Sequence, residues 1–350
     1  MYTAAAADPS RRLCFGMAAA GFGWMALAPG IAFAGDTTAA ESKPAAQRDL
    51  RDWLALVQEA SRRRSYTGIF VVMSAAGTLS SSRIWHACDG DQQFERVEAL
   101  SGPPRATFRH NDRVITFLPE ERIARIERRQ TLDLFPNLLQ GSAATIPDHY
   151  DARLAGTQRV AGIDAHVVDI RPRDHLRFGY RIWSEKRTGL VVKMQTLDAH
   201  GAVLEQAAFS ELEIDVPIKI DRLLRMMEDT AGYRIDKVEP TRTTPEQEGW
   251  MAAAPPVAGF AAIDCYRRPV RAAAGVAAGA MQCVFSDGLA SVSLFLEPYD
   301  TARQPREQTL AVGATHTLGM RLDDHWWLTA MGEVPQQTLR VFAGRFVRGR

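Results

Sequence analysis

The first regular pattern in the chain is a run of apolar residues three or four positions apart, with Arg and Glu side chains on the opposite face. This spacing predicts an amphipathic helix over residues 49–63. Arginines at positions 62–64 close the helix, where positive charge suits the negative end of the helix dipole. The apolar residues are Leu50, Trp53, Leu54, Val57 and Ala60.

Beyond this helix, short runs of β-branched and apolar residues alternate with turn formers such as Asp89-Gly90-Asp91. A break at residues 135–139 divides the runs into two groups. Short strands at this spacing are typical of an antiparallel meander. The pattern therefore predicts a large, curved antiparallel sheet of about ten strands packed on one or two helices. The expected strands are 69–73, 83–87, 94–100, 106–109, 114–118, 123–128, 150–160, 165–170, 180–183, 190–197 and 203–214.

The chain changes character after residue 215, where four prolines interrupt the pattern and only residues 223–227 suggest a short helix. We interpret residues 216–258 as a linker. It would follow a first domain over residues 49–215 and lead into a smaller, largely β domain over residues 259–350. The strands expected there are 260–266, 281–285, 291–297, 314–321, 325–331 and 338–347.

The N-terminus has the three parts of a secretory signal peptide. Arg11 and Arg12 precede an apolar stretch, and Ala32-Phe33-Ala34 supplies small residues for cleavage. The stretch is shorter than the roughly 20 residues of a membrane span. We therefore expect a signal peptide over residues 1–34, a flexible lead over residues 35–48, and an exported protein that does not span the membrane. The simplest destination is a bacterial periplasm.

The charge balance limits the classes of partner. The chain holds 42 basic and 41 acidic residues, and removing residues 1–34 leaves a net charge of zero. Nucleic-acid binders usually carry a basic excess that displaces counterions from phosphates. We therefore expect no nucleic-acid partner.

An oxidising compartment permits disulfides. Of the cysteines, Cys14 leaves with the signal peptide, while Cys265 and Cys283 lie on two predicted strands and could pair. Cys88 would then be the odd one out, although the sequence leaves another pairing for it open.

No recognised catalytic pattern occurs in the chain. The sequence holds no CxxC, HExxH or zinc-ligand spacing, no GxSxG elbow and no phosphate-binding glycine loop. We therefore assign no catalytic residue, no metal and no cofactor. For an exported β-rich chain, a binding protein is a better hypothesis than an enzyme.

An ordered series of motifs runs from the predicted helix almost to the C-terminus. The first domain holds Arg83-Ile84-Trp85-His86, Phe135-Pro136-Asn137-Leu138-Leu139 and Phe178-Gly179-Tyr180-Arg181-Ile182-Trp183. The second holds Phe285-Ser286-Asp287-Gly288-Leu289. In order and spacing these motifs resemble the MucB/RseB family of periplasmic sigma-E regulators.

The resemblance implies a mainly β (α+β) fold. Its first domain would be a half-open antiparallel barrel like LolA and LolB with covering helices, followed by a smaller antiparallel sheet with a helix. It also implies binding to the periplasmic part of a membrane-spanning anti-sigma factor of the RseA/MucA type, which shields that factor from site-1 proteolysis. A lipid or lipopolysaccharide signal would end the protection.

An incompletely filled barrel encloses a cavity lined by apolar side chains. Each candidate could equally be ordinary core, and each candidate arginine could be a solvated strand residue rather than a grip on a partner's carboxylate or a lipid phosphate. The lipid-cavity candidates are Phe70, Val72, Ile84, Phe94, Val114, Tyr180 and Ile182. The partner-contact candidates are Arg83, Arg96, Arg105, Arg173 and Arg181.

Two alternatives compete with regulation by binding. A periplasmic lipid or lipoprotein carrier of the LolA/LolB type would need only the barrel, so the second domain argues against it. A hydrolase would need a nucleophile or a metal set that the sequence does not offer. Association into a homo-oligomer stays open.

Overall fold

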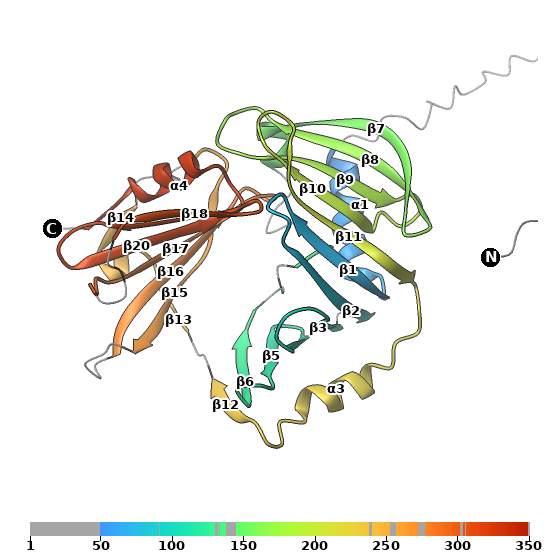
Figure 1. Ribbon diagram of the computed structural model, residues 1–350, viewed down its shortest axis with the longest axis horizontal. Helices are drawn as coiled ribbons and strands as arrows, with labels where there is room; N and C mark the ends of the chain where they lie inside the picture. Colours follow the sequence, from blue (N-terminus) through green and yellow to red (C-terminus); the bar gives the residue numbers. More distant parts are fainter. Residues whose placement is uncertain are drawn as a thin grey trace, which may run out of the picture. The chain divides into compact units, whose positions relative to one another are not determined.

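A computed structural model describes most of the chain beyond the N-terminal region (Figure 1). The contacts divide the chain into a unit over Met1–Ala46 and a compact unit over Gln47–Arg350. The expected signal peptide and flexible lead lie outside the described residues. These are residues 50–348 except 91, 130, 131, 133, 138–144, 238, 239, 253–256, 272–276, 302, 303 and 305.

The first sheet has twelve strands in the order β12-β6-β5-β4-β3-β2-β1-β11-β10-β9-β8-β7. Neighbouring strands are antiparallel except β12 and β6, which are parallel. β1 pairs with β11, opposing Tyr66 to Ile214, so the two ends of the meander meet in the middle of the sheet. The bounds are β1 Tyr66–Ser74, β2 Leu79–Asp89, β3 Gln92–Ala99, β4 Ala106–His110, β5 Arg113–Leu118, β6 Ile123–Arg128, β7 Tyr150–Val160, β8 Ile163–Pro172, β9 Gly179–Glu185, β10 Val191–Leu197, β11 Val203–Ile214 and β12 Arg234–Lys237, with a short helix α2 at Ile146–His149.

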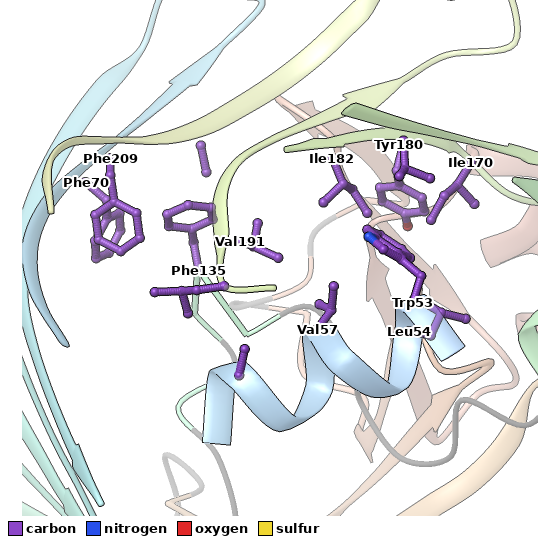
Figure 2. Close-up of a cluster of buried hydrophobic side chains, with 14 of the residues drawn as sticks. Trp53, Leu54, Val57, Phe70, Phe135, Ile170, Tyr180, Ile182, Val191 and Phe209 are labelled. Carbon is purple, nitrogen blue, oxygen red and sulfur yellow. The ribbon is translucent and has the colours of Figure 1, made fainter. Parts of the chain in front are cut away.

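Helix α1 (Leu50–Arg63) packs its apolar face against this sheet (Figure 2). Trp53 is buried, and its indole N–H donates to the Ser184 hydroxyl of β9 at 3.1 Å. Leu54 and Val57 are each 1% exposed in the same cluster. Burying an apolar side chain of this size contributes about 1.5–3 kcal/mol, so the predicted amphipathic stripe holds the helix on the sheet.

The turn between β9 and β10 approaches this helix closely. Gly189 has φ +82°, and a Cβ there would lie 2.6 Å from the Leu56 side chain. Only glycine combines that backbone conformation with such close contact.

A second helix, α3 (Ile220–Glu228), covers another part of the sheet. Its Leu223 and Met227 are buried against Phe94, Phe108 and Phe117. Beyond it, β12 pairs in parallel with β6. The expected linker thus begins with elements that pack on the first sheet, and the division of the chain into domains stays a prediction.

The second sheet has seven strands in the order β13-β15-β16-β17-β20-β19-β18, all antiparallel. Helix α4 (Gln336–Ala343) buries Leu339 and Phe342 in its core. A disulfide joins Cys265 of β15 to Cys283 of β16, which oppose each other in the ladder. The bounds are β13 Thr241–Arg242, β15 Ala261–Arg271, β16 Ala277–Ser286, β17 Ser291–Pro298, β18 Gln308–Val312, β19 Thr315–Arg321 and β20 Trp326–Gly332, and β14 (Trp250–Ala252) pairs with β21 (Phe346–Arg348) after the 3-10 turn η2 (Glu246–Glu248).

The predicted fold class is confirmed: the protein is mainly β, with one large antiparallel sheet that does not close, a few covering helices and a smaller separate sheet. One predicted strand is wrong. Residues 338–347 were expected as a strand but form the end of α4 and then β21. Thr338, Leu339, Phe342 and Ala343 are all buried at helical spacing, so a helical period governs this segment.

Candidate functional site

The seven predicted cavity-lining residues do not form one surface. Phe70, Ile84, Tyr180 and Ile182 belong to the cluster around α1, and Val72 packs against it. Phe94 lies in the separate cluster under α3, and Val114 is buried at 2% exposure. Figure 2 shows the Phe70 ring beside Phe209, and the ring centroids are 6.3 Å apart. These side chains fill core rather than line an open space, and a lipid-binding role for them stays a prediction.

A pocket of about 680 Å³ opens beside the C-terminal end of α1. None of the seven predicted residues lines it. Arg64 pairs with Asp215 at 3.2 Å, and Arg63 lies 3.9 Å from Glu59. Its lining comprises Leu56, Glu59, Ala60, Arg63, Arg64, Ser65, Thr188, Asp215, Val216 and Pro217. The arginine run that the sequence pattern assigns to helix closure therefore also lines a polar pocket.

Two of the five predicted contact arginines have carboxylate partners within the sheet. Arg181 binds Asp169 with Nε and Nη2 at 2.6 and 3.0 Å, and this hydrogen bonding lowers the pKa of Asp169. Arg173 is exposed and binds Asp151 at 2.7 Å. To grip a partner, either arginine would first have to share or release its own carboxylate.

Arg83 and Arg96 lie on the two sides of one aromatic ring. The Arg96 guanidinium is 4.4 Å from the centre of the Trp85 ring and also pairs with Glu98 at 3.0 Å. Arg83 is exposed and lies 5.9 Å from the same ring. Burial lowers the pKa of Arg96. Arg105, also exposed, has no ion pair among the described residues.

A buried polar network crosses the first sheet nearby. Arg109 donates to the Glu95 carboxylate at 2.7 Å, and His86 Nε2 lies 3.7 Å from the same carboxylate. Burial lowers the pKa of His86, which keeps the imidazole neutral, and its Nδ1 lies 2.8 Å from the Arg64 carbonyl oxygen. Burial also raises the pKa of the free Cys88 thiol to about 11. A protonated thiol is a poor nucleophile, so Cys88 does not supply chemistry here.

The loop between β8 and β9 makes a buried ion pair with the turn after β16. The side chains of Arg177 and Asp287 are both fully buried, and Arg177 Nε donates to Asp287 at 2.6 Å. The Tyr150 hydroxyl donates to the same carboxylate oxygen at 2.9 Å. Arg177 also binds Asp174 and the carbonyl oxygen of Ala258, so its guanidinium is held on all sides.

Several neighbours complete this junction. The other Asp287 oxygen accepts the backbone N–H groups of Leu289 and Ala290 at 3.0 and 2.8 Å. The Thr338 hydroxyl of α4 donates to the Leu176 carbonyl oxygen at 2.7 Å. Burial is the main cause that raises the pKa of Tyr150. Two motifs of the chain, far apart in sequence, therefore meet in one fully satisfied polar cluster.

Sequence reasoning missed this pair. Arg177 lies just before the Phe178 motif, and Asp287 lies inside the Phe285–Gly288 motif. A charged residue within each motif was the available signal. The 110 residues between them hide the pairing from any local pattern.

A second contact joins the same two sheets. The Glu205 carboxylate of β11 accepts the backbone N–H of Ala314 in the β18–β19 turn, and burial raises its pKa. Glu333, which follows β20, has a pKa raised to about 7 by burial and by the charge of Glu205. The buried Tyr180 hydroxyl has no hydrogen-bond partner among the described residues. Two carboxyl groups at this contact therefore compete for few donors.

Within the part of the chain that the structure describes, no group of three His, Cys, Asp or Glu side chains could hold a metal ion. No described helix is both long and apolar enough to cross a membrane.

Comparison with known proteins gives a consistent assignment. Residues 49–227 match the MucB/RseB N-terminal domain family, and residues 244–346 match the MucB/RseB C-terminal domain family. The sigma factor AlgU regulatory protein MucB of Pseudomonas aeruginosa is 30% identical over 84% of this chain and 90% of its own length. The sigma-E factor regulatory protein RseB of Escherichia coli K12 is 23% identical over 83% of this chain and 88% of its own.

A solved structure of the Pseudomonas aeruginosa MucA/MucB complex supports the same assignment. It superposes with a TM-score of 0.65 at 25% identity, covering 85% of this chain and 98% of that one. The match in sequence extends over both sheets and over the motifs that meet at Arg177 and Asp287. The chain belongs to the MucB/RseB family of sigma factor regulatory proteins.

Proposed function

We propose that this protein restrains an envelope-stress response governed by sigma-E. It binds the periplasmic part of a membrane-spanning anti-sigma factor of the RseA/MucA type and shields that factor from site-1 proteolysis. The observation that carries the proposal is the match to both MucB/RseB domains together with the relative that was solved in complex with MucA. The anti-sigma factor then persists and keeps sigma-E inactive.

The junction between the sheets supports a role in binding. The fully buried Arg177–Asp287 pair ties the first sheet to the second, which lets the two present one surface to a partner. We infer that Arg83 and Arg105 are the first candidates for contact with partner carboxylates, because both are exposed and neither has an ion pair among the described residues. Arg96, Arg173 and Arg181 are secondary candidates because each holds a carboxylate already.

A lipid or lipopolysaccharide signal would act by binding the free regulator better than the bound one, since a ligand shifts an equilibrium only by its differential affinity for the two states. The pocket beside α1 offers cationic Arg63 and Arg64 at its rim. Leu56 in its lining belongs to the helix whose other face packs on the main core. Acyl chains would have to displace that core to reach Phe70, Val72, Ile84, Tyr180 and Ile182.

We infer that the protein acts by binding, without catalysis, in the periplasm after removal of a signal peptide over residues 1–34. We further propose that residues 49–215 and 259–350 form its two domains. A lipid or lipoprotein carrier is the alternative function. The second sheet and its buried tie to the first favour regulation, because a carrier needs the barrel alone.

Direct binding tests the proposal. The mature chain and the purified periplasmic part of the cognate anti-sigma factor are titrated by calorimetry, without lipid and then with lipopolysaccharide. We expect a stoichiometric complex that lipopolysaccharide weakens. Absence of a complex would contradict the proposal, and lipoprotein transfer between membranes without such a complex would favour the carrier.

A further inference from the structure

Strand β18 forms one free edge of the second sheet. Its ladder partner is β19, with Leu310 opposite Thr317 and Val312 opposite Thr315. Beyond this ladder, no backbone hydrogen bond of residues 308–312 to another described residue is observed. One side of the strand therefore presents unpaired N–H and C=O groups.

This edge lacks the features that protect the other free edges of the two large sheets. Proteins block free edges with charged side chains, bulges or very short strands. β7 carries Arg153 and Arg159 and has a bulge near Gly156. β12 holds three charged residues in four, and β13 is only two residues long. β18 has the sequence QTLAV, without charge, proline or bulge.

The side chains of β18 add an apolar surface to this open edge. Leu310 is 54% exposed and Val312 is 61% exposed, and both point to the same face because side chains alternate along a strand. The row continues across the sheet, since Leu310 opposes Thr317 and Thr317 opposes Met331, which is 40% exposed. An open ladder and a neighbouring apolar row are the two elements of strand addition: the backbone gives affinity and the alternate side chains give specificity.

We propose that β18 binds an extended, uncharged segment of the anti-sigma factor's periplasmic part, which adds to the second sheet as an eighth strand. This inference rests on the proposed function and specifies where the partner binds. The absence of charge on β18 selects an uncharged segment, because a charged strand would be desolvated without a counter-ion. Apolar side chains at alternate positions of that segment would pack beside Leu310 and Val312.

A second copy of this chain is a weaker occupant of the edge. A standard stable interface uses about 20–30 residues on each side, and β18 offers five. An extended segment of a partner can pair with the edge and continue along the row toward Met331. It can therefore bury more surface than the edge alone provides.

Charge substitution on the edge tests the proposal. Leu310→Lys and Val312→Lys place a cation on exposed positions, so the fold should be retained, which circular dichroism and thermal unfolding would verify. We expect each variant to bind the purified periplasmic part of the anti-sigma factor at least tenfold more weakly than wild type. Leu154→Lys, at a 47% exposed position on the protected edge β7, is the matched control and should bind like wild type.

Hydrogen exchange supplies a second readout on the backbone itself. Amides within residues 308–312 should exchange more slowly in the complex than in the free protein. Wild-type affinity in both lysine variants, or unchanged exchange in β18, would overturn the inference while leaving the proposed function intact. If wild type itself does not bind, the proposed function fails. Concentration-dependent dimerisation that Leu310→Lys abolishes would assign the edge to a second copy and would also overturn the inference.

Discussion

Replacing Arg177 with methionine tests the junction between the two sheets. The substitution keeps much of the side-chain volume but removes the cation from a fully buried pair. Asp287 would keep the Tyr150 hydroxyl and two backbone N–H groups, yet its buried negative charge would lose its counter-ion. Breaking a buried ion pair from one side costs about 3–5 kcal/mol, so we expect Arg177→Met to lower the free energy of unfolding by about that amount.

Urea unfolding followed by circular dichroism and tryptophan fluorescence measures the effect. If the pair couples the two sheets, the variant should also unfold in two steps where the wild type unfolds in one. Arg173→Met is the control: it removes an arginine four residues away from an exposed pair, and we expect no measurable change.

The double variant Arg177→Met/Asp287→Asn separates lost charge from lost packing. Asparagine keeps an oxygen for the two N–H donors but removes the unpaired charge, so we expect the double variant to regain at least half of the lost stability. A loss below about 1 kcal/mol for Arg177→Met, or no recovery in the double variant, would refute the reasoning.

Three further predictions concern stability. Because the pKa of Glu333 is raised to about 7, its bound proton stabilises the fold fully below pH 4.5 and this contribution disappears as the pH rises through 7; Glu333→Gln should therefore be more stable than wild type by about 3 kcal/mol at pH 8 and equal to it at pH 4, as urea unfolding at both pH values would show. The Cys265–Cys283 disulfide closes a loop with a sequence separation of 18, so its removal by a double alanine substitution should cost about 3 kcal/mol in thermal unfolding, and an unchanged midpoint would contradict this. Leu54→Ala should cost about 2–5 kcal/mol by the same measurement, whereas Leu79→Ala, at a position 59% exposed, should leave the midpoint in place.

Local periodicity predicted what depends on local periodicity. The stripe from Trp53 to Ala60 became the buried face of α1, and the alternation in residues 66–128 became strands β1–β6 in chain order. The same reasoning placed Cys265 and Cys283 on strands that prove to be neighbours. Each of these features needs only side chains within about one element of each other.

Features set by distant contacts escaped prediction. Residues 338–347 contain β-branched and aromatic side chains that favour a strand, but packing of Leu339 and Phe342 in the second core makes most of the segment helical. Strand β18 is short and mostly exposed, so it lacks the one-sided alternation that marks a half-buried strand. The parallel pairing of β12 with β6 joins residues more than 100 positions apart, and no turn signal announces it.

The candidate site divides in the same way. The sequence identified Arg173 and Arg181 as accessible cations, and the structure places each against a carboxylate on the neighbouring strand. A strand's own sequence does not record which residue opposes it, because that depends on register. The buried partners Arg177 and Asp287 were missed because burial of a charge becomes visible only once both halves of the pair are in place.

The most direct test of the account is protection of the anti-sigma factor. Its purified periplasmic part is digested by the site-1 protease with and without a stoichiometric amount of the mature protein, and the intact factor is followed over time. The account predicts that the protein slows cleavage in proportion to the fraction of factor bound, and that lipopolysaccharide restores the rate. Cleavage at the same rate with and without the protein, under conditions where the two are bound, would contradict it.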